Sequence, residues 1–474
     1  MKKFAFVGVA AIGAILLALF PSAATAQPAP FPSRTVPLAS DTGAFRGAIG
    51  PEAESFTASR QLVEIPGALW LRLRFGDHDL GAESYVTVTS LEDGEQQRLD
   101  AEALRLWQDQ TAMFNGDAVE VELHVAPGEE GIFFRIEEVV AGESVDEHRG
   151  ELLERGALSD GQAPEAICGA TDDRVASTDP GVGRTDTGCT AWIVSNGAYL
   201  TAGHCAGFTE VHFNVPQSMA NGDIVVPPLA DQYPLIAGSF VSANNGTGRD
   251  WAVFDLGPDA GGNNRLAVHA QDAFFRMSRD QNPTNIRITG HGVDGPPPCF
   301  GSRFQPGCPT PNPPRNADNQ TEQTHVGQNQ GEAGSGANVR FEYTVDTQGG
   351  NSGSPLIVDG TDVTVGIHTN GGCSETGGAN AGTSFENDDL EIALRNSSGV
   401  GATVRHLDRG HPVAQGLQDG TVFRPFDTLA EAVNSVPAGG VVSIVAGAYA
   451  GGVTINKPMT VTAPVGTVTL TGTP

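Results

Sequence analysis

Residues Gly350 to Pro355 read Gly-Asn-Ser-Gly-Ser-Pro, and this stretch decides which fold and which chemistry the chain is expected to have. A serine hydroxyl is a weak nucleophile at neutral pH, so hydrolysis requires a base that takes its proton and donors that hold the oxyanion. Glycines on both sides of Ser352 allow backbone angles that turn the amides of Gly350 and Ser352 toward one point. The stretch predicts a nucleophile and an oxyanion hole, although a Gly/Ser-rich run is also typical of a plain loop.

A candidate base lies upstream in Thr201-Ala202-Gly203-His204-Cys205. Two short apolar segments, 191–194 and 199–200, flank a Ser-Asn-Gly turn and predict a hairpin that ends just before His204. An imidazole with a pKa of about 6.5 accepts a proton at neutral pH and returns it to a leaving amine. Cys189 lies sixteen residues before Cys205 and can staple the loop that presents the ring.

The third member of such a triad is a buried carboxylate that fixes the imidazole tautomer. Asp250 stands where the polar loop 244–248 enters the apolar segment 250–254. Asp255, at the far end of the same segment, is the competing candidate, but a solvated turn there is the simpler interpretation. We therefore expect Asp250 to orient His204.

The order His204, Asp250, Ser352 and the sequence around each residue resemble the trypsin-like (chymotrypsin-fold) serine endopeptidases. Within that family the chain is most similar to secreted bacterial glutamyl endopeptidases, in residues 169–174, 201–205, 346–352 and 366–371. The resemblance covers about residues 168–395. It implies a double β-barrel protease domain over residues 166–400, peptide-bond hydrolysis through an acyl-enzyme, protein or peptide substrates, and no cofactor.

The resemblance leaves two interpretations of the specificity pocket open. Asp346 aligns with the pocket carboxylate with which trypsin-like enzymes bind lysine or arginine. Thr347 and His368 align with the threonine and histidine that hold a substrate carboxylate in glutamyl endopeptidases, and hydroxyl and imidazolium donors suit an anion. The sequence around His368 departs from the trypsin pattern, which favours glutamate before the cut bond. A strand histidine without substrate contact is the structural alternative for His368.

Length, leader and cysteines favour an exported protein of several domains. The chain has 474 residues, too many for one small core. Residues 1–26 are typical of a secretory signal peptide, with a retained anchor as the alternative. Six cysteines in an exported chain are expected to pair. The expected pairs are Cys189 with Cys205, Cys299 with Cys308 and, guided by related secreted proteases, Cys168 with Cys373.

The charge balance tells against nucleic acid as a partner. The formal net charge is −29, with 56 acidic and 27 basic residues. Polyanion binding needs basic patches, and none is visible in the sequence. No His-Glu-x-x-His zinc signature and no phosphate-binding loop occurs either, so no metal is assigned. We expect a secreted, extracellular protein without a membrane segment after signal removal.

Before the protease region, residues 27–150 predict a β-sandwich-like domain. Apolar residues alternate with polar ones over 69–75, 119–125 and 132–136, within a stretch of strands from Phe45 to Val140, and only 100–110 look helical. We interpret this domain as a propeptide that assists folding or blocks the site, with a permanent non-catalytic domain as the alternative. The linker 151–165 is the expected processing site, since cutting after Glu165 would leave Ala166 as a new terminus that amino-terminal sequencing would reveal.

Two later segments differ in character from the protease region. Residues 294–336 are rich in Pro, Asn, Gln and Gly and predict a long loop. Residues 416–474 predict a short helix, at 428–433, and then short strands at 441–445, 453–455 and 460–462, which resemble the first coils of a parallel β-helix. A carbohydrate-binding role for this tail is an analogy only.

The sequence thus predicts a mainly β, secreted serine endopeptidase made as a zymogen. The alternatives are trypsin-like specificity through Asp346, and a non-catalytic surface binding protein that displays the tail. The intact set of three triad residues favours the enzyme.

Overall fold

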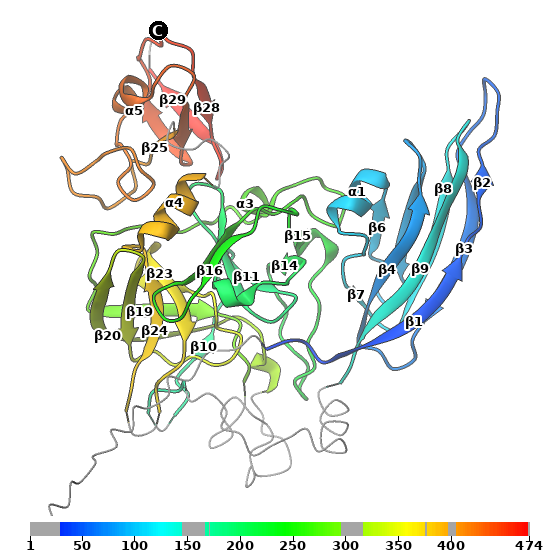
Figure 1. Ribbon diagram of the computed structural model, residues 1–474, viewed down its shortest axis with the longest axis horizontal. Helices are drawn as coiled ribbons and strands as arrows, with labels where there is room; N and C mark the ends of the chain where they lie inside the picture. Colours follow the sequence, from blue (N-terminus) through cyan, green and yellow to red (C-terminus); the bar gives the residue numbers. More distant parts are fainter. Residues whose placement is uncertain are drawn as a thin grey trace, which may run out of the picture.

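The computed structural model describes residues 29–144, 166–169, 171–294, 316–374, 377–396 and 404–472. They are mainly β structure and form three units in chain order, coloured from blue to red in Figure 1. The expected signal peptide, the processing linker 151–165 and the cysteines Cys299 and Cys308 lie outside the described residues.

Two antiparallel sheets form the amino-terminal unit. One contains β1 (Ser33–Asp41), β9 (Glu130–Gly142), β4 (Trp70–Asp79) and β7 (Phe114–Asn115), with β2 (Phe45–Arg46) beside β9. The other contains β3 (Phe56–Glu64), β8 (Ala118–Val125), β5 (Tyr85–Ser90) and β6 (Gln96–Leu99). Every second residue of β8 is buried, and the inner faces share a core with Leu71, Val121 and Phe134. This is the layout of a β-sandwich.

Strand β1 is absent from the sequence expectation, which began the strands at Phe45. It pairs with β9 from Ser33 onward, opposite Gly142. Its residues alternate in burial, but only Val36 and Leu38 pack against the core, so the apolar pattern is too weak to be recognised.

The helix expected at 100–110 is shorter in the structure. Helix α1 (Ala101–Leu106) is capped by the Asp100 carboxylate, which accepts from the backbone N–H of Glu102 and Ala103. It ends early because Gln108 and Asp109 have φ of 56° and 58°, which no α-helix accommodates.

Two more sheets form the central unit. The first runs in the order β15 (Gln232–Pro234), β14 (Glu210–His212), β11 (Val182–Thr185), β12 (Thr190–Ile193), β13 (Tyr199–Thr201), β17 (Asp250–Phe254) and β16 (Val241–Asn244). A single bridge between Leu235 and Leu256 joins the ends of β15 and β17. It is a curved, half-closed barrel.

The second central sheet closes completely. It runs β20 (Gln323–Ser335), β19 (Asn285–Gly290), β22 (Pro355–Val358), β23 (Val363–Asn370), β24 (Asn380–Ser384) and β21 (Asn338–Tyr343), and β21 pairs back with β20. The short strands β10 (Val175–Ala176) and β18 (Arg276–Met277) pair with β20 and β23. A closed six-stranded barrel beside a half-barrel agrees with the double β-barrel that the sequence predicts.

Strand β20 corrects the expectation of a long loop over 294–336. Its 13 residues are mostly exposed and contain a single large apolar residue, Val326, so hydrophobic periodicity gives no signal. The strand forms because β19 and β21 supply ladder hydrogen bonds along its two parts. Tertiary pairing therefore overrides a composition typical of loops.

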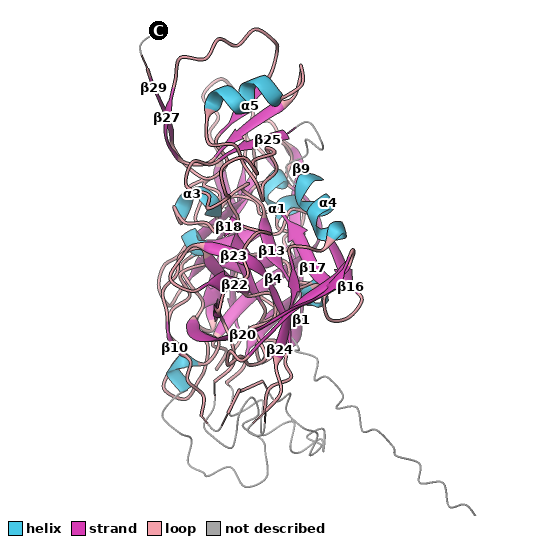
Figure 2. Ribbon diagram, turned by 90° about the vertical axis from the view of Figure 1, so that its left-hand side faces the viewer, coloured by secondary structure: helices cyan, strands magenta, loops and turns pink. Residues whose placement is uncertain are grey.

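The carboxyl-terminal unit is a small parallel assembly at one end of the molecule, as both views show (Figure 1, Figure 2). It contains the sheet β25 (Val404–Leu407), β26 (Val441–Ile444) and β28 (Thr460–Thr462), and the pair β27 (Gly447–Ala450) and β29 (Val468–Thr471). Helix α5 (Leu429–Ser435) begins with a capping box between Thr428 and Glu431.

Two expectations for this unit were wrong in detail. Residues 453–455 form no strand, and β27 and β29 take the second layer instead. The unit also begins before residue 416, because β25 pairs in parallel with β26 from Val404 opposite Val441. A four-residue strand between polar loops carries too little pattern to mark that boundary.

The amino-terminal and central units are held together by buried polar contacts. Arg72 of β4 pairs with Asp186 at 2.8 Å and with Glu210 of β14, and all three side chains are at most 6% exposed. The two carboxylates outweigh burial, so the pKa of Arg72 lies above its ordinary value. The Gln232 side chain accepts from the backbone N–H of Met113 and donates to its carbonyl, both at 2.9 Å.

No helix among the described residues is both long enough and apolar enough to cross a lipid bilayer.

Arg72→Ala is expected to lower the free energy of unfolding by about 3 kcal/mol, because Asp186 and Glu210 would stay buried without a cation. Arg74→Ala is the matched control: its pair with Glu138 lies at 2.6 Å but the Arg74 side chain is 47% exposed, so a loss below about 1 kcal/mol is expected. Urea unfolding monitored by tryptophan fluorescence measures both. Equal losses would contradict a special role for Arg72.

Candidate active site

The His204 ring is presented by the turn that follows strand β13. Strands β12 and β13 form the expected hairpin, and the single turn η1 (Gly203–Cys205) follows at once. The disulfide between Cys189 and Cys205 ties this turn to the start of β12. The ring therefore sits on a short, cross-linked element instead of a free loop.

Asp250, and not Asp255, contacts the histidine. Its two carboxylate oxygens accept from His204, one from Nδ1 at 2.6 Å and the other from the backbone N–H at 3.0 Å. Asp250 is buried at the first position of β17, and its backbone N–H donates to Thr383 Oγ1. A carboxylate on Nδ1 fixes the tautomer in which Nε2 is free to accept a proton.

The Ser352 loop packs directly against this histidine hairpin. Gly353 follows the serine with φ of 91°, and a Cβ there would lie 2.2 Å from both the Thr190 carbonyl and Thr201 Oγ1. The Trp192 indole N–H donates to the Gly353 carbonyl, and the Thr190 N–H donates to the Ser352 carbonyl, each at 2.9 Å. The loop is thus fixed by backbone contacts that leave the serine side chain unused.

The candidate nucleophile and the candidate base have no hydrogen-bond partner within the described part of the chain. Ser352 Oγ and His204 Nε2 are both buried, and neither makes a hydrogen bond. Buried polar atoms without a partner call for an explanation, and Ser354 Oγ and His291 Nδ1 are in the same position. The bond between nucleophile and base often forms only in the substrate complex.

The backbone around Ser352 leaves two amide N–H groups without a partner among the described residues. The carbonyl of Gly349 accepts from Val293 N at 2.8 Å, and that of Asn351 accepts from Ser354 N at 2.9 Å. Because N–H and C=O point in opposite directions across a trans peptide, the N–H groups of Gly350 and Ser352 are turned away from these partners. In the described structure neither N–H donates a hydrogen bond. They are available as oxyanion donors.

Gly350 cannot be replaced without disturbing this geometry. It has φ of 98°, and a Cβ on it would lie 2.5 Å from the His291 carbonyl. Its own carbonyl accepts from Thr190 Oγ1 at 2.9 Å. The glycine expected from sequence is required here by both angle and space.

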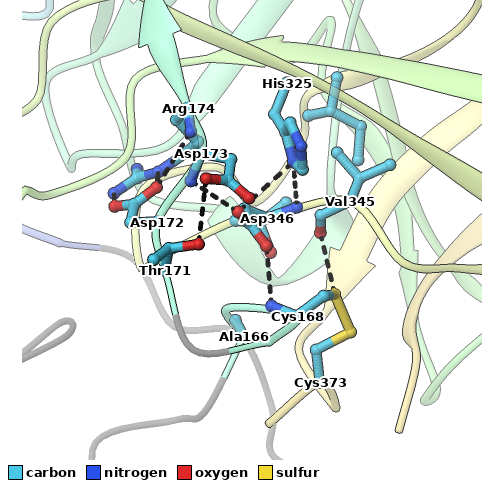
Figure 3. Close-up of polar contacts among 12 residues, drawn as sticks. Ala166, Cys168, Thr171, Asp172, Asp173, Arg174, His325, Val345, Asp346 and Cys373 are labelled. Carbon is cyan, nitrogen blue, oxygen red and sulfur yellow. Dashed lines mark hydrogen bonds and ion pairs between the residues drawn. A yellow bond between two sulfur atoms is a disulfide. The ribbon is translucent and has the colours of Figure 1, made fainter. Parts of the chain in front are cut away.

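Asp346 anchors the segment that begins at residue 166 (Figure 3). Its Oδ1 accepts from the Cys168 N–H at 2.7 Å and its Oδ2 from the Asp173 N–H at 2.8 Å. Burial raises the pKa of Asp346, although these amide bonds oppose the shift. The disulfide between Cys168 and Cys373 adds a covalent tie beside it. The carboxylate expected to bind substrate is thus occupied by backbone donors.

Thr347 is fully buried beside the same segment. Its N–H donates to the Ala166 carbonyl at 3.2 Å, and Asn380 Nδ2 donates both to that carbonyl and to Thr347 Oγ1. The Thr347 hydroxyl therefore already accepts one bond, and its proton has no acceptor among the described residues. It remains able to donate to a ligand.

His368 is neutral, which corrects the expectation of an imidazolium. Burial, with a smaller contribution from His204, lowers the pKa of His368 to about 3. Tyr343 OH lies 2.7 Å from His368 Nδ1, and burial raises the pKa of Tyr343 far above its ordinary value, so the phenol keeps its proton and can donate it to Nδ1. The neutral ring then carries its proton on Nε2, which is buried and makes no bond to any described residue.

Two clusters place three potential metal ligands near one point. In Cys189, His204 and Cys205 the two sulfurs are joined in a disulfide, so they cannot act as thiolate ligands. In Asp173, His325 and Asp346, the Asp346 oxygens and His325 Nδ1 already accept from backbone N–H groups. Neither cluster is arranged for a cation.

Several residues at the site had no signal in the sequence. Thr190 holds the Ser352 loop, Tyr343 sets the His368 tautomer, and Asn380 orients Thr347. Each acts on a residue more than twenty positions away, so only the fold brings the pair together.

Comparison with known proteins gives limited information. No protein-family model and no curated protein matches the chain. The solved structures similar to it include a thermostable serine protease, AL20, from an extremophilic microorganism (14% identity, TM-score 0.31, 45% of this chain and 97% of that chain), and the protease Anisep from Arthrobacter nicotinovorans (12% identity, TM-score 0.31, 45% of this chain and 93% of that chain). Identities of this size transfer no residue role from one chain to another.

The neutral state of His368 makes a prediction for stability. Its folded pKa of about 3 lies below the ordinary 6.5, so only the unfolded chain binds this proton between those values and stability falls as pH falls. His368→Asn should reduce the loss between pH 6.5 and 4.5 by on the order of 2 kcal/mol. Urea unfolding at both pH values measures it. The control is His269→Asn, at an exposed position; the same reduction in both variants would refute the assignment.

Proposed function

We propose that the chain is a serine endopeptidase in which Ser352 attacks the peptide carbonyl, His204 is the general base and Asp250 orients it. The observation that carries the proposal is the pair of buried, unpartnered atoms, Ser352 Oγ and His204 Nε2, on a histidine whose other ring nitrogen lies 2.6 Å from Asp250. Because Ser354 Oγ is unpartnered too, the contact of His204 with Asp250 is what distinguishes this pair.

The reaction follows from these positions. His204 Nε2 takes the proton of Ser352 as the oxygen attacks, and the developing oxyanion is held by the N–H groups of Gly350 and Ser352. Asp250 stabilises the imidazolium that forms. The same ring then gives its proton to the leaving amine, and a water molecule hydrolyses the acyl-enzyme by the reverse sequence. Two easier steps, acylation of Ser352 and hydrolysis of the acyl-enzyme, thus replace one difficult hydrolysis.

Ser352→Ala should lower kcat for a peptide substrate by on the order of a million-fold, because it removes the nucleophile. Ser354→Ala is the matched control: its hydroxyl is buried in the same loop and makes no hydrogen bond to a described residue, so activity should change by only a few fold. Release of a fluorophore from a quenched peptide measures both. Hydrolysis that persists in Ser352→Ala would refute the nucleophile and favour the binding-protein alternative.

The same assay distinguishes the two candidate carboxylates. Asp250→Asn should lower kcat by about 10,000-fold, since the wrong tautomer of His204 is then stabilised. Asp255→Asn, at the other end of β17, should retain activity. The reverse order would assign the role to Asp255.

For specificity, the donors around the pocket support glutamate before the cut bond. Thr347 offers a hydroxyl proton and His368 an Nε2–H, and a buried carboxylate requires donors of this kind. The trypsin-like alternative has weaker support, because both oxygens of Asp346 already accept backbone bonds and its pKa is raised by burial. A carboxylate that binds the cation of a lysine or arginine side chain would be expected to keep its oxygens free of such partners.

Thr347→Val should reduce kcat/KM for a glutamyl peptide by about 10- to 100-fold, the cost of one charge-assisted hydrogen bond. Thr347→Ser keeps the hydroxyl and is the matched control. Cleavage of three peptides that differ only in glutamate, glutamine or lysine before the cut bond measures the preference. Faster cleavage after lysine, lost on Asp346→Asn, would establish the trypsin-like alternative.

The remaining expectations extend this function. Two disulfides fit an exported protein, and the enzyme would be secreted as a zymogen whose linker 151–165 is cut. The amino-terminal unit would then be a propeptide, with a permanent domain as the alternative. Protein or peptide substrates follow from the chemistry. For carbohydrate binding by the carboxyl-terminal unit, the geometry offers no specific support.

A further inference from the structure

The segment Ala29-Pro30-Phe31-Pro32, which precedes β1, lies on the central unit and not on its own. The Ala29 N–H donates to the Gly188 carbonyl at 3.1 Å, and Gln320 Nε2 donates to the Ala29 carbonyl. Both backbone groups of one residue are thus paired with the other unit. The prolines at 30 and 32 hold the residues before them in extended backbone, so the segment is pre-ordered. In Figure 1 this part of the chain runs from β1 to the central sheets.

Gly188, whose carbonyl accepts from the Ala29 N–H, lies beside Gly350 of the Ser352 loop. A Cβ on Gly188 would lie 1.8 Å from the Ala29 carbonyl oxygen, so the segment packs on bare backbone. The Gly188 carbonyl oxygen itself lies 3.4 Å from the position of a Cβ on Gly350. Ala29 therefore contacts Gly188, and Gly188 in turn lies beside Gly350, whose N–H is a candidate oxyanion donor.

Phe31 is buried and contacts residues of both units. Its ring is 5% exposed and lies 4.6 Å from the Arg184 guanidinium carbon. It also contacts His212, with ring centroids 6.5 Å apart, and Trp70 of β4 at the same distance. Burial lowers the pKa of Arg184 to about 9, so a ring face over this cation replaces the carboxylate that buried arginines usually have.

The position of Gly188 indicates on which side of the candidate triad residues 29–32 lie. Of the candidate specificity residues, His368 lies on β23 of the second sheet, and Thr347 lies in the loop between β21 and β22, beside Ala166. Gly188 lies in the turn between β11 and β12 of the first sheet and precedes Cys189, whose disulfide partner Cys205 follows His204. The leaving amine must lie at His204, which protonates it. Chain residues that follow the cut bond would therefore run toward Gly188.

We propose that residues 29–32 are a built-in strap that occupies the leaving-group side of the cleft, where it pairs with Gly188 as a substrate backbone would. Phe31 is its anchor. The inference rests on the proposed function, and it adds that cutting the linker 151–165 does not suffice for activity on long substrates. The strap must also leave.

The test compares two substrates with the same acyl part on the intact secreted chain. One ends in a small chromogenic amide, and the other continues for six residues beyond the cut bond. Phe31→Ala should raise kcat/KM for the extended peptide at least tenfold and leave the short amide within twofold. Ala29→Pro, which removes the N–H that donates to the Gly188 carbonyl, should act in the same direction. Phe56→Ala, at a 42% exposed ring on β3, is the matched control and should change neither.

A binding assay keeps the inference testable if the chain lacks activity. A fluorescent peptide of residues 27–34 should bind the Ser352→Ala, Phe31→Ala double variant and not Ser352→Ala alone, whose own strap fills the site. Equal changes with both substrates, or no difference in peptide binding, would overturn the strap. Loss of hydrolysis in every variant together with the expected binding difference would instead refute the proposed function and leave the strap established.

Discussion

The contact of Gly353 with the β12–β13 hairpin is the constraint on which the rest of the site depends. The hairpin belongs to the first central sheet and the Ser352 loop to the second, and the two meet where a single Cβ would lie 2.2 Å from Thr190 and Thr201. Only bare backbone lets them approach this closely. The buried Trp192 indole and the Thr190 backbone then fix the register between the two sheets. The histidine and the serine are thereby held by separate sheets that cannot slide.

In the candidate site, the atoms proposed to react make no hydrogen bond to another described residue. Several neighbouring groups are paired: Asp250 through both oxygens, Asp346 through both oxygens, and Gly349 and Asn351 through their carbonyls. Within the described chain, Ser352 Oγ, His204 Nε2 and His368 Nε2 stay unpaired. Preorganised polar groups of this kind lose nothing to reorganisation when charge develops in the reaction.

Sequence reasoning succeeded where a local pattern carries the information. The hairpin before His204, the sandwich strands with a period of two and the short helix at 429–435 all follow from neighbouring residues. It failed at β20 and β25, whose strands exist only because distant partners pair with them, and at His368, whose protonation depends on burial. Asp250 and Cys205 could be assigned because the chemistry demands a partner. Tyr343 and Asn380 could not, since nothing near them in sequence indicates what they touch.

The buried ion pairs of Arg72 with Asp186 and Glu210 bear on when the amino-terminal unit would separate from the central unit. While the connection through 145–165 is covalent, the amino-terminal unit acts at an effective concentration in the millimolar range, and dissociation is immediately reversed. Once that connection is cut, the same contacts become an ordinary bimolecular equilibrium. Dilution after secretion would then separate the two parts, whereas a crowded source would keep them together.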